Sequence, residues 1–209
     1  MSATVGRTVL RAAPWPALLG GCVVATALFG IAAAVHHGPL AFPITLLALG
    51  LCGATAAYVL DEASAEVEDA TPTGRRARVA WRLPIALVPF AVGAAAVLLL
   101  DGLGGAAGWD RLVPVAAGSV AAGIAFASGL RRTGRFAPGD LAGALAFGVV
   151  VLVVANEPLH AWVSFAPLES PTYPRATALA WLLVLVTCAA VLGACERDPG
   201  RAPVRKEIA

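Results

Sequence analysis

The residues best suited to chemistry gather in one polar segment, residues 61–82, which reads DEASAEVEDATPTGRRARVAWR. Five carboxylates come first and four arginines follow, and long apolar runs flank the segment on both sides. It is the longest charged interruption inside the chain. The chemistry that this pattern favours is the recognition of a soluble partner, because closely spaced charges in a solvated segment offer ion pairs and hydrogen bonds.

Two other groups could do chemistry, and for each a simpler interpretation is available. Glu157 and His160 stand one helical turn apart and could form an acid–base pair. No nucleophile or third metal ligand is in register with them, so we favour a structural role in a turn. His36 and His37 could bind a metal or respond to pH, but we favour polar residues at a lipid–water boundary. We therefore expect no catalytic, metal or cofactor site on this chain, and no enzyme activity.

The elements that must position these residues are apolar helices. The chain has 59% hydrophobic and 13% charged residues, whereas soluble domains average about 25% charged. A helix of roughly 20 apolar residues crosses a bilayer and satisfies its own backbone hydrogen bonds there. Six segments fit this pattern, and none contains an ionisable Asp, Glu, Lys, Arg or His: Pro16–Val35, Leu40–Leu60, Leu83–Leu100, Leu112–Leu130, Leu141–Ala155 and Ala176–Cys195. The sequence therefore predicts an all-α, polytopic membrane protein with six transmembrane helices.

The orientation of the predicted helices follows from the basic residues. Thirteen of the fifteen lysines and arginines fall on one side of the six segments, and only Arg111 and Arg175 fall on the other. Basic residues favour the cytosolic side of a membrane protein. We therefore expect both termini and the 61–82 segment to be cytosolic.

The sequence predicts three regions along the chain. Residues 1–15 interleave Val5, Val9 and Leu10 with arginines and predict an amphipathic segment at the inner interface, anchored by Trp15. A frayed terminus is the alternative. Residues 16–195 form the transmembrane domain, and residues 196–209 form a polar cytosolic tail.

The connections between the helices differ in character. In the first long one, residues 64–70 can form two helical turns that Pro72 ends. Arg75, Arg76, Arg78 and Arg82 follow and are expected to meet anionic headgroups. Between the fifth and sixth segments, residues 157–167 are too short to cross and too apolar for water, which favours a re-entrant segment. Trp162 there and Trp181 in the last segment are expected to be interface anchors.

Small residues and cysteines favour close packing. The pairs Ser119/Gly123 and Gly139/Gly143 have the four-residue spacing that suits close helix approach or a dimer contact. The four cysteines form no CxxC pair and are expected to be small packing residues.

The layout resembles the membrane subunits of type V ATP-binding-cassette exporters. Those subunits have six spans, an amphipathic segment before the first, a cytosolic coupling helix between spans two and three, and re-entrant helices between spans five and six. The amino-acid sequence of the charged segment also resembles a segment in small actinobacterial exporter proteins, which has an LDD-PA-ET-ATPT pattern before an arginine cluster. Here Leu60, Asp61, Glu62 and residues 70–73 carry that resemblance, and Ala63 replaces its proline.

The resemblance implies a function and partners. It implies export of a hydrophobic or amphipathic substrate such as a peptide, lipid or drug, with ATP and Mg bound by a separate ATPase and not by this chain. A second permease half, identical or related, and membrane lipid would be the other partners, and nucleic acid would not. The resemblance also implies a location in the inner membrane of a bacterial cell. The residues that the resemblance assigns to ATPase docking are Asp61, Glu62, Ser64, Glu66, Val67, Asp69 and Thr71. The alternatives are a membrane scaffold or accessory subunit without a conduction pathway, and an intramembrane enzyme.

Overall fold

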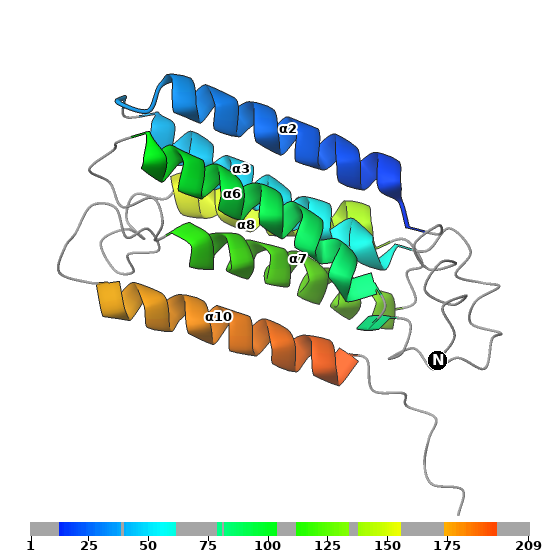
Figure 1. Cartoon of the computed structure of the whole chain (residues 1–209). Coiled ribbons are helices and arrows are strands. Elements are labelled where there is room, and N and C mark those ends of the chain that lie inside the picture. Colours follow the sequence, from blue (N-terminus) through cyan, green and yellow to red (C-terminus); the bar gives the residue numbers. More distant parts are fainter. Residues whose placement is uncertain are drawn as a thin grey trace, which may run out of the picture.

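In the computed structural model, every regular element is a helix within the residues that the structure describes, which are 13–38, 40–61, 79–80, 82–103, 112–133, 138–155 and 174–195. The all-α prediction is confirmed for these residues. Figure 1 shows the helices side by side in one bundle, with long axes running in nearly the same direction.

The helix bounds lie close to the six predicted segments. The elements are α2 (Trp15–Ala34), α3 (Ala41–Ala57) continued by the 3-10 turn η1 (Tyr58–Leu60), η2 (Leu83–Ala86) leading into α6 (Leu87–Gly102), α7 (Val113–Arg132), α8 (Gly139–Ala155) and α10 (Pro174–Cys195). Prolines stand in the first turn of α2, η2 and α7, where the missing N–H leaves no helical bond unmade. The fifth helix begins earlier than predicted, because Asp140 in its first turn suits the positive end of the helix dipole.

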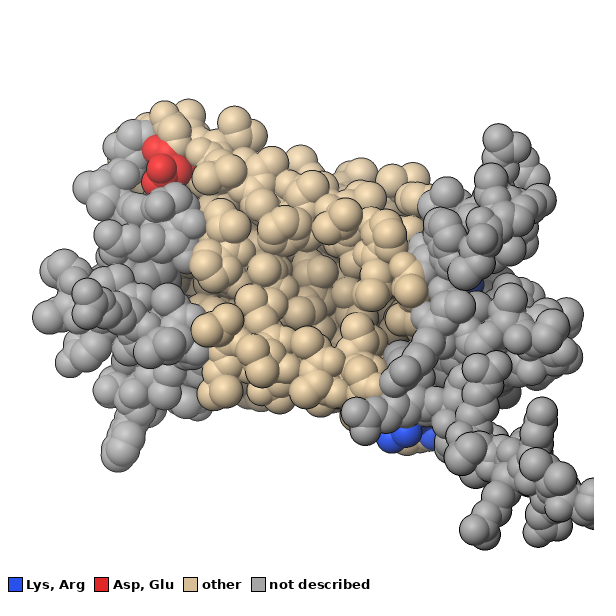
Figure 2. Space-filling view, turned by 60° about the horizontal axis from the view of Figure 1, so that its bottom comes forward, with Lys and Arg blue, Asp and Glu red and all other residues tan. Residues whose placement is uncertain are grey.

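Four of the helical stretches are long and apolar enough to cross a membrane: Trp15–Ala34, Ala41–Leu60, Leu83–Gly102 and Val113–Arg132. Their outward surfaces are apolar too, as at Leu19 and Val23 in α2 and Leu99 in α6. On the face shown in Figure 2, a broad band without charged side chains separates acidic atoms at one end of the bundle from basic atoms at the other. An exposed apolar band of this kind suits a lipid environment.

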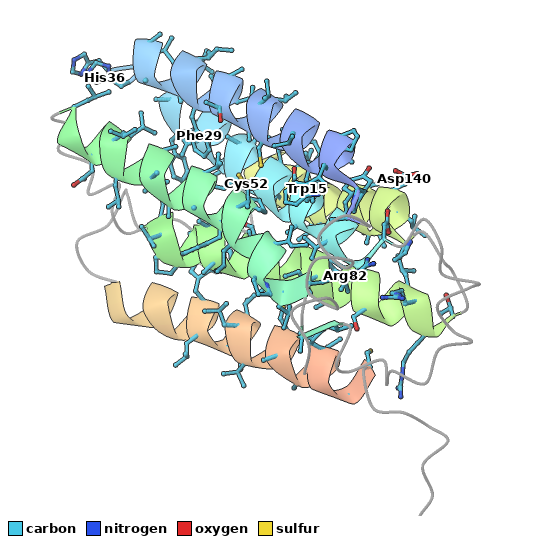
Figure 3. The ribbon with its side chains drawn as sticks, turned by 45° about the vertical axis from the view of Figure 1, so that its right-hand side comes forward. Trp15, Phe29, His36, Cys52, Arg82 and Asp140 are labelled. Carbon is cyan, nitrogen blue, oxygen red and sulfur yellow. The ribbon has the colours of Figure 1, made fainter. Side chains whose placement is uncertain are left out.

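The helices alternate in direction, so their connections fall at two ends. α2 begins at the same end as α10 finishes (Figure 1). We call this the loop end, because α3 finishes and η2 begins there, on either side of the 61–82 segment. His36 follows α2 at the opposite end (Figure 3).

Helix α3 forms the centre of the bundle. It packs against α2, α7 and α8 and also contacts α6. Its side chains are correspondingly buried: Leu49, Cys52 and Ala56 are all fully covered. Helix α10 is peripheral, because among the described helices it packs extensively only against α7. Trp181 takes part in that contact, with its ring lying against Gly118.

The backbones of α3 and α7 approach closely where both carry small residues. A methyl group placed on Gly53 would lie 2.5 Å from the carbonyl oxygen of Ser119, and one on Gly123 would meet the carbonyl oxygen of Gly53. Small residues permit this approach between apolar helices. Gly143 similarly faces Ala54 across the α3–α8 contact. The expected close approach at Ser119/Gly123 and Gly139/Gly143 is confirmed, and it occurs within one chain.

Three threonine hydroxyl groups within the apolar helices are satisfied by their own helix. Thr26, Thr45 and Thr55 each donate a hydrogen bond to the backbone carbonyl four residues earlier, at 2.7–2.8 Å. This arrangement removes most of the cost of placing a polar group in an apolar environment. These residues are therefore compatible with a helix in lipid and need no partner on another element.

Candidate functional site: a polar cluster at the loop end

Polar side chains from several elements meet at the loop end. The cluster contains Tyr58 and Asp61 at the end of α3, Arg82 before η2, Arg131 in the last turn of α7 and Asp140 in the first turn of α8. Figure 3 shows Arg82 and Asp140 at this end of the bundle, with His36 at the other. The cluster brings together residues up to 82 positions apart in the sequence.

A hydrogen bond joins Asp61 and Arg82, the first and last residues of the charged segment (residues 61–82). The Nη1 group of Arg82 donates a hydrogen bond to the backbone carbonyl oxygen of Asp61 at 2.6 Å. The Arg82 side chain is only 1% exposed. A buried guanidinium can hold a carbonyl firmly, since the bond is charge-assisted and shielded from water. We call this contact the clasp; it fixes where the segment leaves and re-enters the bundle.

The carboxylate of Asp61 ties the clasp to α8. Its Oδ1 atom accepts a hydrogen bond from the backbone N–H of Gly139 at 2.7 Å. This N–H belongs to the first turn of α8, where backbone donors have no helical partner. Gly139 has to lack a side chain here, because an added Cβ would lie 2.7 Å from the ring of Tyr58 and 2.8 Å from Cγ of Asp61.

A second bond joins α3 to α8. The hydroxyl of Tyr58 donates to Oδ1 of Asp140 at 2.7 Å. The end of α3 is thus bonded to the start of α8 through two carboxylates, Asp61 and Asp140, and to the start of η2 through the clasp. Movement of the charged segment at Asp61 would therefore act on several helices at once.

The surroundings of Asp61 shift its acidity. Burial raises the pKa of Asp61 from 3.8 to about 6, and the negative charge of Asp140 acts in the same direction. The N–H of Gly139 and the positive charges of Arg131 and Arg82 lower the pKa of Asp61 and offset part of this increase. Burial dominates because it removes water from the charged form.

We expect this shift to appear in the pH dependence of stability. The folded protein holds the Asp61 proton more tightly than the unfolded chain does, so stability falls as the pH rises from about 4 to about 6. Asp61→Asn should reduce the slope of the melting temperature against pH over this range, as measured for the purified protein in detergent. Asp101→Asn at the opposite end is the control and should leave the slope in place. An unchanged slope in Asp61→Asn would contradict the assignment.

The structure describes only part of the predicted site. Of the expected docking residues, Asp61 lies in the cluster, and the rest lie outside the described residues: Glu62, Ser64, Glu66, Val67, Asp69 and Thr71. The expected anchors Arg75, Arg76, Arg78 and Trp162 lie outside them as well. Three further predicted segments also lie outside the described residues: the amphipathic segment before Arg11, the re-entrant segment 157–167 and the tail after Cys195. These expectations stay predictions.

Three expected anchors have described positions. Trp15 begins α2 and is half-buried against the core, and Trp181 is half-buried beside Gly118. Arg82 is buried in the clasp, which is a structural role that the sequence did not indicate. A contact of these three side chains with lipid headgroups stays a prediction.

Sequence reasoning did not single out Tyr58 or Asp140, and it gave Gly139 a packing role only. A signal for Asp140 was present, since an acidic residue after Pro138 and Gly139 is typical of a helix start. Nothing in the sequence indicates that this helix start lies beside Tyr58, 82 residues earlier.

The two histidines at the other end form a local arrangement. Nδ1 of His36 lies 2.8 Å from the carbonyl oxygen of Ala33, and the two rings lie 3.7 Å apart. Among the described residues, no group of three or more His, Cys, Asp or Glu could hold a metal ion. Glu157 and His160 lie outside those residues.

Comparison of the chain with protein-family models, with curated proteins and with solved structures finds no match in any of the three.

Proposed function

We propose that this chain is the transmembrane subunit of an ATP-binding-cassette exporter in a bacterial inner membrane. Six helices cross the bilayer with both termini in the cytosol, and a re-entrant segment lies outside between the fifth and sixth. Residues 61–71 dock on a separate ATPase, which binds ATP and Mg. Two permease halves pair, and a hydrophobic or amphipathic substrate passes between them.

The clasp is the observation that supports this proposal best. A segment that transmits force must be fixed where it joins the helices. Flexible connections at these points would absorb its displacement before it reached the helices. Arg82 bonds Asp61 across the two ends of the segment, and Asp61 in turn bonds α8. Displacement of the segment by an ATPase would therefore shift α3, α6 and α8 as packed bodies, which is the usual way that domains transmit motion.

The charge distribution supports the proposed source of energy. The six predicted spans contain no ionisable Asp, Glu, Lys, Arg or His, whereas proton- and ion-driven carriers depend on such groups within the membrane. Transport by this chain would then draw its energy from a partner. The charged segment is the longest polar part between the helices and thus the best candidate for that contact.

The direct test is co-purification from native membranes. The tagged full-length chain should retain an ATPase whose ATP hydrolysis is measurable and sensitive to vanadate. Replacing Glu66, Val67 and Asp69 together by alanine should abolish the retained activity, because these residues lie in the proposed docking turn. Asp101→Ala at the opposite end is the control and should retain it. Retention of full ATPase activity by the triple variant would contradict the docking role.

The orientation is tested independently by labelling. A single cysteine at position 65, in a chain whose four native cysteines are replaced, should react with a membrane-impermeant maleimide in inside-out vesicles and not in intact cells. A cysteine at position 37 should show the opposite behaviour. Reaction of position 65 from outside the cell would contradict the proposed topology.

A further inference from the structure

A groove of about 420 Å³ lies on the side of the bundle between α2, α3 and α8. Helix α3 forms its floor with Ala54 and Thr55, α2 contributes Ala17 and Gly21, and α8 contributes Ala144 and Phe147. Its volume falls within the range of small-molecule sites, which is about 300–1,000 Å³.

The groove is a consequence of how α2 and α8 pack on α3. Each approaches α3 closely at a glycine: Gly21 lies against Thr55, and Gly143 lies against Ala54. The two outer helices make few contacts with each other. Two helices that pack closely on a third and make few contacts with each other leave a groove between them that small side chains do not fill.

The two ends of the groove differ in polarity. One end is formed by the hydroxyl of Tyr58 and the carboxylate of Asp140, which belong to the polar cluster at the loop end. From there the groove extends along α3 to Leu51, seven residues and two helical turns away, or about 10 Å at 1.5 Å per residue. This part is lined mainly by Ala, Gly, Leu and Phe.

The charge at the polar end determines the sign of a fitting ligand. Asp140 is the only Asp, Glu, Lys, Arg or His among the described residues that line the groove, and Arg82 and Arg131 of the polar cluster do not line it. Its side chain is exposed, and Tyr58 donates to one of its oxygens. An ammonium group would meet the carboxylate at this end, whereas a phosphate or carboxylate would be repelled and would find the Tyr58 proton already engaged.

We propose that this groove binds a single-chain cationic amphiphile, with its ammonium group at Asp140 and its alkyl chain along α3 toward Leu51 and Phe147. In a membrane with the loop end at the inner surface, the ammonium group lies at headgroup depth and the chain lies in the inner leaflet. That the bound molecule is the exported substrate rests on the proposed function; the binding itself does not.

The test uses the full-length protein in a neutral detergent, titrated with dodecylammonium and followed by native mass spectrometry. We expect one saturable binding event per chain and no such event with dodecyl phosphate. Asp140→Asn keeps an oxygen for Tyr58 and removes the charge, and it should weaken binding by about tenfold or more. Asp101→Asn, which removes a charge at the opposite end, should bind as the unmodified protein does.

A second pair of variants tests the apolar part. Ala144→Leu places a larger side chain in the groove and should also weaken binding, whereas Ala91→Leu on the exposed side of α6 should not. Melting temperatures of all four variants establish that they fold. Absence of saturable binding, equal binding of dodecyl phosphate, or unchanged binding by a folded Asp140→Asn would overturn the proposal.

The outcomes separate this inference from the proposed function. Saturable binding that depends on Asp140, without a retained ATPase, would uphold the groove and contradict the exporter. A retained ATPase without saturable binding would uphold the exporter and overturn the groove as a site for cationic amphiphiles.

Discussion

Gly123→Leu is expected to destabilise the protein more than any other single substitution considered for this chain. Even a methyl group at Gly123 would overlap the backbone carbonyl of Gly53. A backbone atom cannot rotate away as a side chain can, so α3 and α7 would have to separate. Helix α3 packs more extensively against α7 than against any other helix. We expect a loss of about 3 kcal/mol or more in the free energy of unfolding.

Gly129→Leu is the matched control for this substitution. Gly129 lies in the same helix, and nothing would lie within 4 Å of a Cβ added there. The measurement is a thermal melt in detergent followed with a thiol-reactive dye, since Cys22 and Cys52 are buried and become reactive on unfolding. Gly123→Leu should melt far earlier than the unmodified protein, and Gly129→Leu should melt close to it. Similar melting of the two variants would contradict the close crossing of α3 and α7.

Arg82→Met is expected to have the second largest effect. The substitution keeps a long side chain but leaves the carbonyl oxygen of Asp61 without its donor from Arg82. Loss of a buried hydrogen bond from a charged donor costs about 1.5–3 kcal/mol. The change also removes a positive charge that lowers the pKa of Asp61. The decline in stability with rising pH should therefore extend to higher pH in the variant.

Arg132→Met is the control for Arg82→Met, because Arg132 is exposed at the end of α7. Exposed charges contribute little to stability, so this variant should retain the melting temperature and pH profile of the unmodified protein. Arg82→Lys keeps the charge and one donor and should recover part of the loss. The clasp would be excluded if Arg82→Met and Arg132→Met melted at the same temperature and shared one pH profile.

The stability variants and the functional variants report on different parts of the chain. Arg82 and Asp61 hold the ends of the charged segment, whereas Glu66, Val67 and Asp69 lie in its proposed docking turn. If the segment transmits force, Arg82→Met should retain the ATPase on purification but lose ATP-dependent transport. The triple alanine variant should lose both.

The sequence by itself determined the helices. Each long apolar segment became a helix within a few residues of its predicted bounds, because apolar side chains without interruption favour one structure that satisfies every backbone group. Pro16, Pro84 and Pro114 marked three of the starts for a reason that is equally local. The four-residue spacing of Ser119 and Gly123 likewise indicated where helices could approach closely.

Only the tertiary structure decided which helices meet. Arg82 was expected at the membrane surface because the sequence shows its charge but not the carbonyl of Asp61 beside it. Tyr58, Gly139 and Asp140 are ordinary residues near helix ends until α8 packs on α3, and the groove between α2 and α8 exists because both pack on α3 and make few contacts with each other. Helix formation depends on neighbours within one turn, whereas a site depends on side chains from distant segments. The apolar surfaces of the helices carry little information about which helix will pack against them.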